Sequence, residues 1–426
     1  MRTKAIVGVL GVVMALSGAL AAPGGVRAAA PTNTVIAWNG FMMATFATAN
    51  VPPPTSTRLG AMVQAAVFDA VNGIEPEYTY IHVAPAAPLD ASRQAAAAGA
   101  AYTALVSLFP SQKTKLDADL AASVAAMNGD GDDSDSAVAA GLAWGGAVAG
   151  QILSWRATDG FNAILPPYVP GTAPGDWVPT LGGSGPPKFR QLATTTPFAL
   201  TSPSQFRPAG PPALSSARYA IGFNEVKAMG GLTSTERTAF QAETANFWQL
   251  DTPIDMWDRV ADSLAEAHHL NLLRVARLLA FLNIAEADAA IAVWDAKNQF
   301  NFWRPITAIA QADLDGNPDT APDPTWLPLL VTPYFQEYPS GHSGVSGAAA
   351  TVLASFFGND AEFTISSNGL PGVTRSFTSF TDAVAQVADA RVFAGFHFRF
   401  SCDDASHMGA QVAGYAESTL MRSLDD

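Results

Sequence analysis

Two cations seven residues apart, Lys297 and Arg304, lie among aromatic residues in a chain that has few bases. On a continuous helix this spacing would place both side chains on one face, about 10 Å apart. Two cations on one face can bind an anion, although a charge pair packed on aromatic residues at the surface has the same pattern. The spacing indicates a candidate anion site and leaves the surface interpretation open.

The segment Tyr338-Pro339-Ser340-Gly341-His342 brings a hydroxyl, a glycine amide and an imidazole into one turn. The break at Pro339 followed by Ser340 predicts a helix start, where free backbone N–H groups and the positive end of the helix dipole favour a bound oxyanion. A histidine at a helix start can also be a simple polar cap. This segment is the second candidate site.

Arg391 and His397 form a third candidate pair. Six helical residues would separate them by about 120° and 9 Å, so they reach one point only if the arginine side chain sweeps across and Gly395 opens room. Considered alone, this pair is a weak signal.

The elements that must position these residues are helices. Apolar residues recur at i, i+3 and i+4 from Leu59 to Val71, which is the pattern of a helix facing a core. Further stretches with helical character span 95–108, 112–127, 136–155, 216–229, 235–249, 253–267, 270–303, 340–357, 378–398 and 404–422. No alternation typical of strands competes over a useful length, so we predict an all-α fold.

A proline-rich segment separates two helical halves. Residues 166–212 contain twelve of the thirty prolines and cannot stay helical for long. A stretch of about fifty residues is too long for an ordinary connection, and its aromatic residues favour a wrap over a surface. We predict an N-terminal helical half over 31–165, a strap over 166–215, and a C-terminal half over 216–426 that carries the oxyanion site.

Residues 1–30 have the features of a secretory signal peptide. Arg2 and Lys4 precede an apolar run over 5–22, and the small residues of 19–21 and 28–30 fit a cleavage site. A membrane anchor is the alternative, but three glycines interrupt the run and Pro23 follows it. We predict that the mature chain is secreted and has no membrane attachment.

Composition excludes several other classes. The chain is 49% apolar and 14% charged, which excludes an intrinsically disordered protein. Its net charge of −14 makes nucleic acid a poor partner. Cys402 is the only cysteine, so no intramolecular disulfide and no cysteine-based zinc cluster can form.

Together and in this order, Lys-x6-Arg-Pro, Pro-Ser-Gly-His and Arg-x5-His resemble the motifs of the vanadium-dependent haloperoxidase and type 2 phosphatidic acid phosphatase superfamily. The similarity extends from about Val35 to the C-terminus and fits the bacterial secreted haloperoxidase-like branch best. It implies two four-helix bundles and a site that holds vanadate or phosphate. The residues that it implies as ligands of the oxyanion are Lys297, Arg304, Arg391, Ser340 and Gly341.

The resemblance implies further roles for other matching residues. His397 is similar to the histidine that bonds vanadium directly, and His342 to the general acid–base on the apical side. Trp294 and Phe335 match aromatic residues of the halide pocket. Asp251 resembles the carboxylate that orients the acid–base histidine.

The third motif departs from the family pattern, which usually begins Ser-Arg and carries an aspartate four residues after the histidine. Here Ala390 precedes the arginine, and Ser401 stands where the aspartate is expected. A missing carboxylate would alter the orientation or basicity of His397. Asp403 and Asp404 follow slightly later, and either could replace it.

Two activities and one binding role are compatible with these residues. A haloperoxidase would oxidise halide with hydrogen peroxide to hypohalous acid and act on an organic acceptor, with His342 taking the peroxide proton and Lys297 polarising the peroxide. A secreted acid phosphatase would cleave a phosphate ester through a phosphohistidine at His397. A phosphate-binding protein without activity is the third alternative. The aromatic pair favours the haloperoxidase, whereas Ser401 favours the phosphatase.

Overall fold

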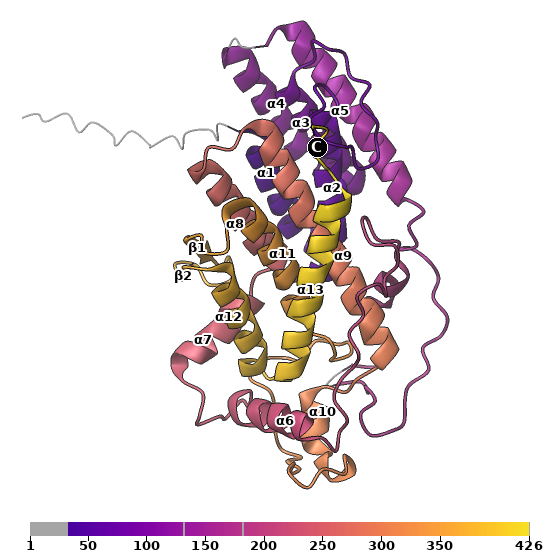
Figure 1. The fold of residues 1–426 in the computed structure, drawn as a ribbon, viewed down its shortest axis with the longest axis vertical. Coiled ribbons are helices and arrows are strands. Elements are labelled where there is room, and N and C mark those ends of the chain that lie inside the picture. Colours follow the sequence, from indigo (N-terminus) through magenta and orange to yellow (C-terminus); the bar gives the residue numbers. More distant parts are fainter. Residues whose placement is uncertain (1–32, 131–132, 181–182, 426) are drawn as a thin grey trace, which may run out of the picture. The chain divides into compact units, whose positions relative to one another are not determined.

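The computed structural model describes residues 33–130, 133–180 and 183–425 (Figure 1). The residues from Asn33 onward form one compact unit. Within the described part of the chain there are thirteen α-helices, three short 3-10 helices and one pair of strands. The predicted all-α class is confirmed.

The first five helices pack together around α2 and α3. They are α1 (Thr34–Thr48), α2 (Pro53–Asn72), α3 (Arg93–Leu108), α4 (Lys113–Asp130) and α5 (Asp135–Arg156), with η1 (Pro110–Gln112) before α4. A Cβ atom on Gly145 would lie 2.1 Å from the Ala96 carbonyl, so α5 meets the α3 backbone directly. Among the described helices, α5 alone has the length and apolar composition of a membrane span.

Helix α9 is the longest helix of the described chain and lies at the centre of the remaining part, in which α12 packs against α7 and α11 (Figure 1). It is apolar on nearly all sides because α2, α8, α11 and α13 all pack against it. The elements of this part are α6 (Ala217–Met229), α7 (Ala239–Gln249), α8 (Pro253–Ala267), α9 (Leu272–Phe300), α10 (Pro305–Ala310), η3 (Ala312–Leu314), α11 (Gly341–Phe357), α12 (Phe380–Phe393) and α13 (Arg399–Thr419).

Helices α11 and α13 cross at glycines. A Cβ atom on Gly409 would lie 2.0 Å from the Gly344 carbonyl, which only glycine avoids. Near the N-termini of both helices, the amide of Ser340 donates to the carbonyl of Ser401 at 3.1 Å. The start of α11 and the start of α13 are thereby fixed beside each other.

Two of the helices that carry candidate site residues end sooner than the sequence predicts. Helix α9 stops at Phe300 because Asn301 adopts a left-handed conformation, with φ of 46°. Helix α12 stops at Phe393, and Gly395 has φ of 79°. Only glycine suits this second turn, since a Cβ there would also lie 2.6 Å from the Gly230 carbonyl.

A short hairpin was not predicted from the sequence. Strands β1 (Phe363–Ser366) and β2 (Thr374–Phe377) pair antiparallel. Four residues per strand are too few for a clear alternation, and the hairpin is held instead by aromatic packing of Phe363 against Phe377 and Phe380.

The described residues of 166–215 contain one 3-10 helix, η2 (Arg190–Thr194), and otherwise irregular backbone. Two anchors attach this segment to α9 and the turn that follows it. The amide of Trp177 donates to the Asn301 carbonyl at 2.6 Å. Asp288 accepts hydrogen bonds from three successive amides, 198–200, at 2.7–3.0 Å. The division into two halves and a strap stays a prediction.

Buried carboxyl groups lie where α8 packs against α9. Asp258 and Glu286 have no exposed surface, and both carboxylate oxygens of Glu286 are without a partner among the described residues. Asn283 donates to Asp258 at 2.8 Å. Burial raises the pKa of both carboxyl groups well above the usual range, and repulsion from Asp262 adds to this for Asp258, as repulsion from Asp258 does for Glu286. The folded state therefore holds protons that the unfolded chain would release.

We predict that Glu286→Gln stabilises the protein at pH 8 more than at pH 5. Because the pKa of Glu286 is raised by folding, the free energy of unfolding falls as pH rises from its usual pKa towards the raised one. The loss is about 1.4 kcal/mol per pH unit for one proton. Denaturant unfolding at both pH values measures it, with the exposed Glu236→Gln as control. An equal effect of Glu286→Gln at both pH values would contradict the prediction.

Candidate active site

Lys297 lies in the last turn of α9 with no exposed surface. Its Nζ donates to the carbonyls of Gln336 and Glu337, both at 2.8 Å. This lysine is therefore fixed to the loop that precedes α11, rather than to a carboxylate.

Arg304 is the N-cap residue of α10 and is also fully buried. Its Nε donates to the Phe335 carbonyl at 2.8 Å, and its Nη1 to the Phe396 carbonyl at 3.0 Å. The spacing indicated that Lys297 and Arg304 share one face of a continuous helix. In the structure they lie on different elements. Lys297 is on α9 and Arg304 is at the start of α10, and both side chains donate to carbonyls of the loop that precedes α11.

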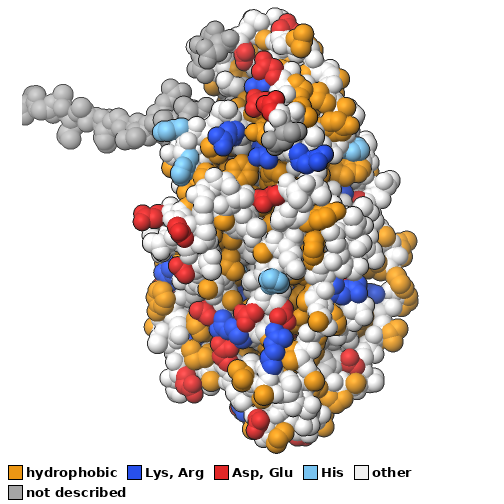
Figure 2. All heavy atoms as spheres, in the orientation of Figure 1, with side chains coloured by type: hydrophobic (Ala, Val, Ile, Leu, Met, Phe, Trp, Pro, Cys, Tyr) orange, Lys and Arg blue, Asp and Glu red, His pale blue; other side chains and the backbone are white. Residues whose placement is uncertain are grey.

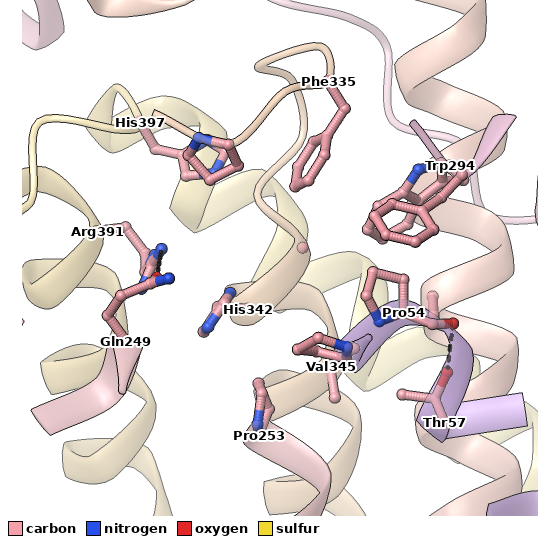
Figure 3. A pocket seen from close by; sticks show the side chains of 15 residues that line it. Pro54, Thr57, Gln249, Pro253, Trp294, Phe335, His342, Val345, Arg391 and His397 are labelled. Carbon is pink, nitrogen blue, oxygen red and sulfur yellow. Dashed lines mark hydrogen bonds between the residues drawn. The ribbon is translucent and has the colours of Figure 1, made fainter. Parts of the chain in front are cut away.

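Arg391 lies in the last turn of α12 and donates from Nη2 to the side-chain oxygen of Gln249 at 2.7 Å (Figure 3). Gln249 is the last residue of α7. The Nε and Nη1 atoms of Arg391 are buried without a partner among the described residues, as is Nη2 of Arg304. Three donor atoms on two guanidinium groups are thus available to a ligand.

The predicted helix start at Ser340 is confirmed, because Ser340 is the N-cap of α11. Its Oγ accepts from the hydroxyl of Ser343 at 3.1 Å, which leaves its own hydrogen free to donate. Gly341 and His342 are the first two helical residues, so their backbone N–H groups have no partner within the helix.

His397 follows Gly395 in the turn between α12 and α13 and is almost completely buried. Its Nδ1 lies 2.8 Å from Oε1 of Glu337, and its Nε2 lies 3.2 Å from Nη1 of Arg304. The same Oε1 also accepts from the Phe398 amide at 3.0 Å. Because a guanidinium group can only donate, Nε2 accepts from Arg304 and Nδ1 carries the proton that faces Glu337.

A cavity of about 170 Å³ lies where these elements meet (Figure 3). The predicted residues that line it are Gly341, His342, Trp294, Phe335, Arg391 and His397. Lys297, Arg304 and Ser340 are buried behind its wall. In Figure 3, both imidazoles belong to this one cavity, with His342 between Arg391 and Val345.

One wall of the cavity is apolar. The rings of Trp294 and Phe335 lie 5.2 Å apart, and Lys297 Nζ lies 5.2 Å from the Phe335 ring centre. Phe189, from the proline-rich segment, packs edge-on against both rings. Prolines 53, 54, 253 and 333 complete this wall.

Asp251 lies outside the cavity lining. Its Oδ2 accepts from Arg259 at 2.6 Å and from the Asn368 amide at 2.7 Å. Among the described residues it has no hydrogen bond to His342. The residue of the same segment that reaches the site is Gln249, two positions earlier.

Burial sets the protonation of the site. It lowers the pKa of Lys297 well below the usual range, that of Arg304 to about 9 and that of Arg391 to about 10. Burial, followed by the charge of Arg391, also lowers the pKa of His342 well below 6.5. The imidazole of His342 is therefore neutral near pH 7 and can accept a proton.

The site cations differ from those at the surface. Figure 2 shows basic side chains lying beside acidic ones on one face of the molecule, and the ion pairs include Arg218 with Asp404 at 2.7 Å. Arg399 likewise pairs with Glu225 at 2.6 Å. In the described structure, Lys297 and Arg391 have no such carboxylate partner, and a buried cation without one is costly.

Comparisons with known proteins give one family match and one curated relative. Residues 277–426 match the family described as the VCPO second helical-bundle domain. Vanadium chloroperoxidase from Curvularia inaequalis is 27% identical in an alignment that covers 49% of this chain and 44% of that protein. The chain thus spans less than half the length of this curated relative.

Two solved structures are similar over most of the chain. A bacterial vanadium-dependent iodoperoxidase has a TM-score of 0.77 at 25% identity, covering 92% of this chain and 98% of that one. The holo form of a bacterial vanadium-dependent chloroperoxidase has a TM-score of 0.68 at 18% identity, covering 86% and 91%. The family match over residues 277–426 and the similarity of these folds support the resemblance to the vanadium-dependent haloperoxidase and type 2 phosphatidic acid phosphatase superfamily.

The donor set suits the oxyanion chemistry of this superfamily. A tetrahedral oxyanion needs several fixed donors and cations to replace its water shell. The unpartnered guanidinium atoms of Arg304 and Arg391 and the free amides at the start of α11 are such donors. These donors therefore fit a bound vanadate or phosphate.

Two contacts of this superfamily site were not predicted from the sequence. Glu337 binds His397, whereas Asp404 binds Tyr338 and Arg218 instead. Glu337 directly precedes the Tyr-Pro-Ser-Gly-His segment, so its position next to a motif was the available signal. Gln249 gave no signal, because its role depends on where α7 ends against α12.

We predict that Gln249→Glu weakens phosphate binding about tenfold, or about 1.4 kcal/mol. The new carboxylate would pair with Arg391 and cancel the charge that the anion needs. Isothermal titration with inorganic phosphate measures this. Gln241→Glu, near the start of the same helix, adds the same charge far from the cavity and is expected to bind normally. Unchanged affinity in Gln249→Glu would show that Arg391 does not serve the anion.

Proposed function

We propose that this chain is a vanadate-dependent haloperoxidase that oxidises halide with hydrogen peroxide and halogenates an organic acceptor. The observation that carries the proposal is the cavity itself. It combines unpartnered cationic donors and an unprotonated imidazole nitrogen with the apolar wall of Trp294, Phe335 and Phe189. A weakly hydrated halide is better matched by aromatic edges and a nearby lysine than by carboxylates.

Vanadate, when bound, supplies the Lewis-acid centre that activates peroxide for attack by halide. Arg304 and Arg391 would hold its oxygens, together with the Ser340 hydroxyl and the Gly341 amide. His397 would present Nε2 to the metal. Lys297, fixed by two carbonyls, keeps one N–H to direct at the reacting oxygen.

His342 would act as the acid–base. Its lowered pKa keeps the imidazole neutral near pH 7, so it can take a proton from peroxide and return it to the departing oxygen. Arg391 disfavours the imidazolium, which makes the return of the proton favourable. Asp251 binds Arg259 and is not proposed to orient His342.

An acid phosphatase is the second candidate. It is favoured by Nε2 of His397, an unprotonated nitrogen beside a buried arginine that could act as the nucleophile. The same donors would stabilise the transferring phosphoryl group, because its trigonal-bipyramidal transition state resembles bound vanadate.

We predict that protein reconstituted with orthovanadate brominates phenol red when bromide and peroxide are supplied. His397→Ala should abolish this, since no other side chain replaces the metal-facing nitrogen. His407→Ala, on α13 and outside the cavity lining, is the matched control and should retain activity. Hydrolysis of p-nitrophenyl phosphate by vanadium-free protein, with no bromination after reconstitution, would reverse the order of the two candidates.

We also propose that the protein is exported. Residues 1–30, on which this depends, lie outside the described residues. Expression of the full chain in a bacterium should release a mature form that begins after Ala21 or Ala30, as read by N-terminal sequencing. An uncleaved chain in the cell pellet would contradict export.

A further inference from the structure

Glu337 is the carboxylate that touches His397, and it comes from a different segment than the superfamily pattern provides. That pattern places an aspartate four residues after the histidine, on the same helix start. Here Ser401 occupies the position, and its Oγ is 3.5 Å from Nδ1 of His397. Glu337 reaches the same nitrogen at 2.8 Å from the loop before α11.

The two positions are therefore alternative sources for one interaction. Both side chains approach a single N–H, and both residues are completely buried. Two carboxylates at one buried donor would repel each other. Ser401 leaves room for the longer side chain of Glu337. His397 therefore keeps a carboxylate partner, although position 401 lacks the aspartate of the superfamily pattern.

Glu337 is also attached at more than one point. Its backbone carbonyl accepts from Lys297, and its amide donates to the Phe302 carbonyl at 2.9 Å. Its Oε1 accepts from the Phe398 amide as well as from His397. A residue held in this way can fix the orientation of the imidazole ring and keep Nε2 directed at the cavity.

We propose that Glu337 is the positioning residue of His397, and that it replaces the superfamily aspartate from a different part of the chain. It fixes the proton on Nδ1, so that Nε2 presents its lone pair to a bound oxyanion. The proposal rests on the oxyanion site of the proposed function, but it applies equally to vanadate and to phosphate.

The experiment is a double-mutant cycle between positions 337 and 401. Glu337→Gln keeps the shape of the side chain and removes its charge, and should weaken orthovanadate binding 10- to 100-fold. Adding Ser401→Asp to that variant returns a carboxylate to Nδ1 and should restore affinity to within about threefold of the wild type. Ser401→Asp alone should not tighten binding, because Glu337 already occupies the donor. Isothermal titration of vanadium-free protein measures each variant.

A second measurement needs no ligand. The Nδ1 proton of His397, assigned by its loss in His397→Ala, should shift upfield in Glu337→Gln and return in the double variant. Glu243→Gln, which removes a carboxylate from the surface pair with Arg375, should change neither measurement. Glu337→Asp keeps the charge but shortens the side chain, and should also bind vanadate weakly. It provides the test if Glu337→Gln does not fold.

The outcomes separate this inference from the proposed function. Unchanged vanadate affinity and an unchanged proton shift in Glu337→Gln would overturn the positioning role while leaving the haloperoxidase proposal intact. Loss of affinity without rescue by Ser401→Asp would also overturn it, because the loss would then be structural. Wild-type protein that binds vanadate but does not oxidise halide would remove only the haloperoxidase.

Discussion

The structure depends on burying three cations close to one another. Lys297, Arg304 and Arg391 are all buried, and burial of an unpaired cation is among the most expensive events in folding. Backbone carbonyls of residues 335–337 and 396, together with the Gln249 amide, offset part of that cost. The rest is available to an anion, because a bound oxyanion restores the charged forms that burial disfavours. Affinity for the oxyanion and the cost of burying these cations have the same physical origin.

Helix ends, rather than helix faces, carry this constraint. The site uses the end of α9, the start of α10, the start of α11, the end of α12 and the turn before α13. Free N–H and C=O groups are found at such ends, and they can bind anions and cations without additional side chains. The glycine crossing of α11 and α13 brings two of these ends together. The bundle positions the ends, and the turns between helices supply the chemistry.

The placement of carboxylates decides what the site can do. Surface arginines are neutralised by acids, whereas no Asp or Glu is among the described residues that line the cavity, and the buried Glu337 faces a histidine instead of a cation. A neutral Gln249 beside Arg391 leaves that cation free for the ligand. Haloperoxidase and phosphatase chemistry both require this excess of positive charge. The apolar wall of Trp294, Phe335 and Phe189 is the feature that distinguishes them.

The sequence alone determined the helical class, because helical periodicity is a local pattern, and the resemblance of its motifs named six of the fifteen residues that line the cavity. It predicted the helix start at Ser340 correctly, since a cap is a local feature. It did not reveal that α9 ends at Phe300, that Asp251 binds Arg259, or that Glu337 reaches His397. The two hydrogen bonds join residues that are 8 and 60 positions apart in the chain. Only the packing of α7, α12 and the loop before α11 decided them, because a side chain's partner depends on which backbone ends meet in space.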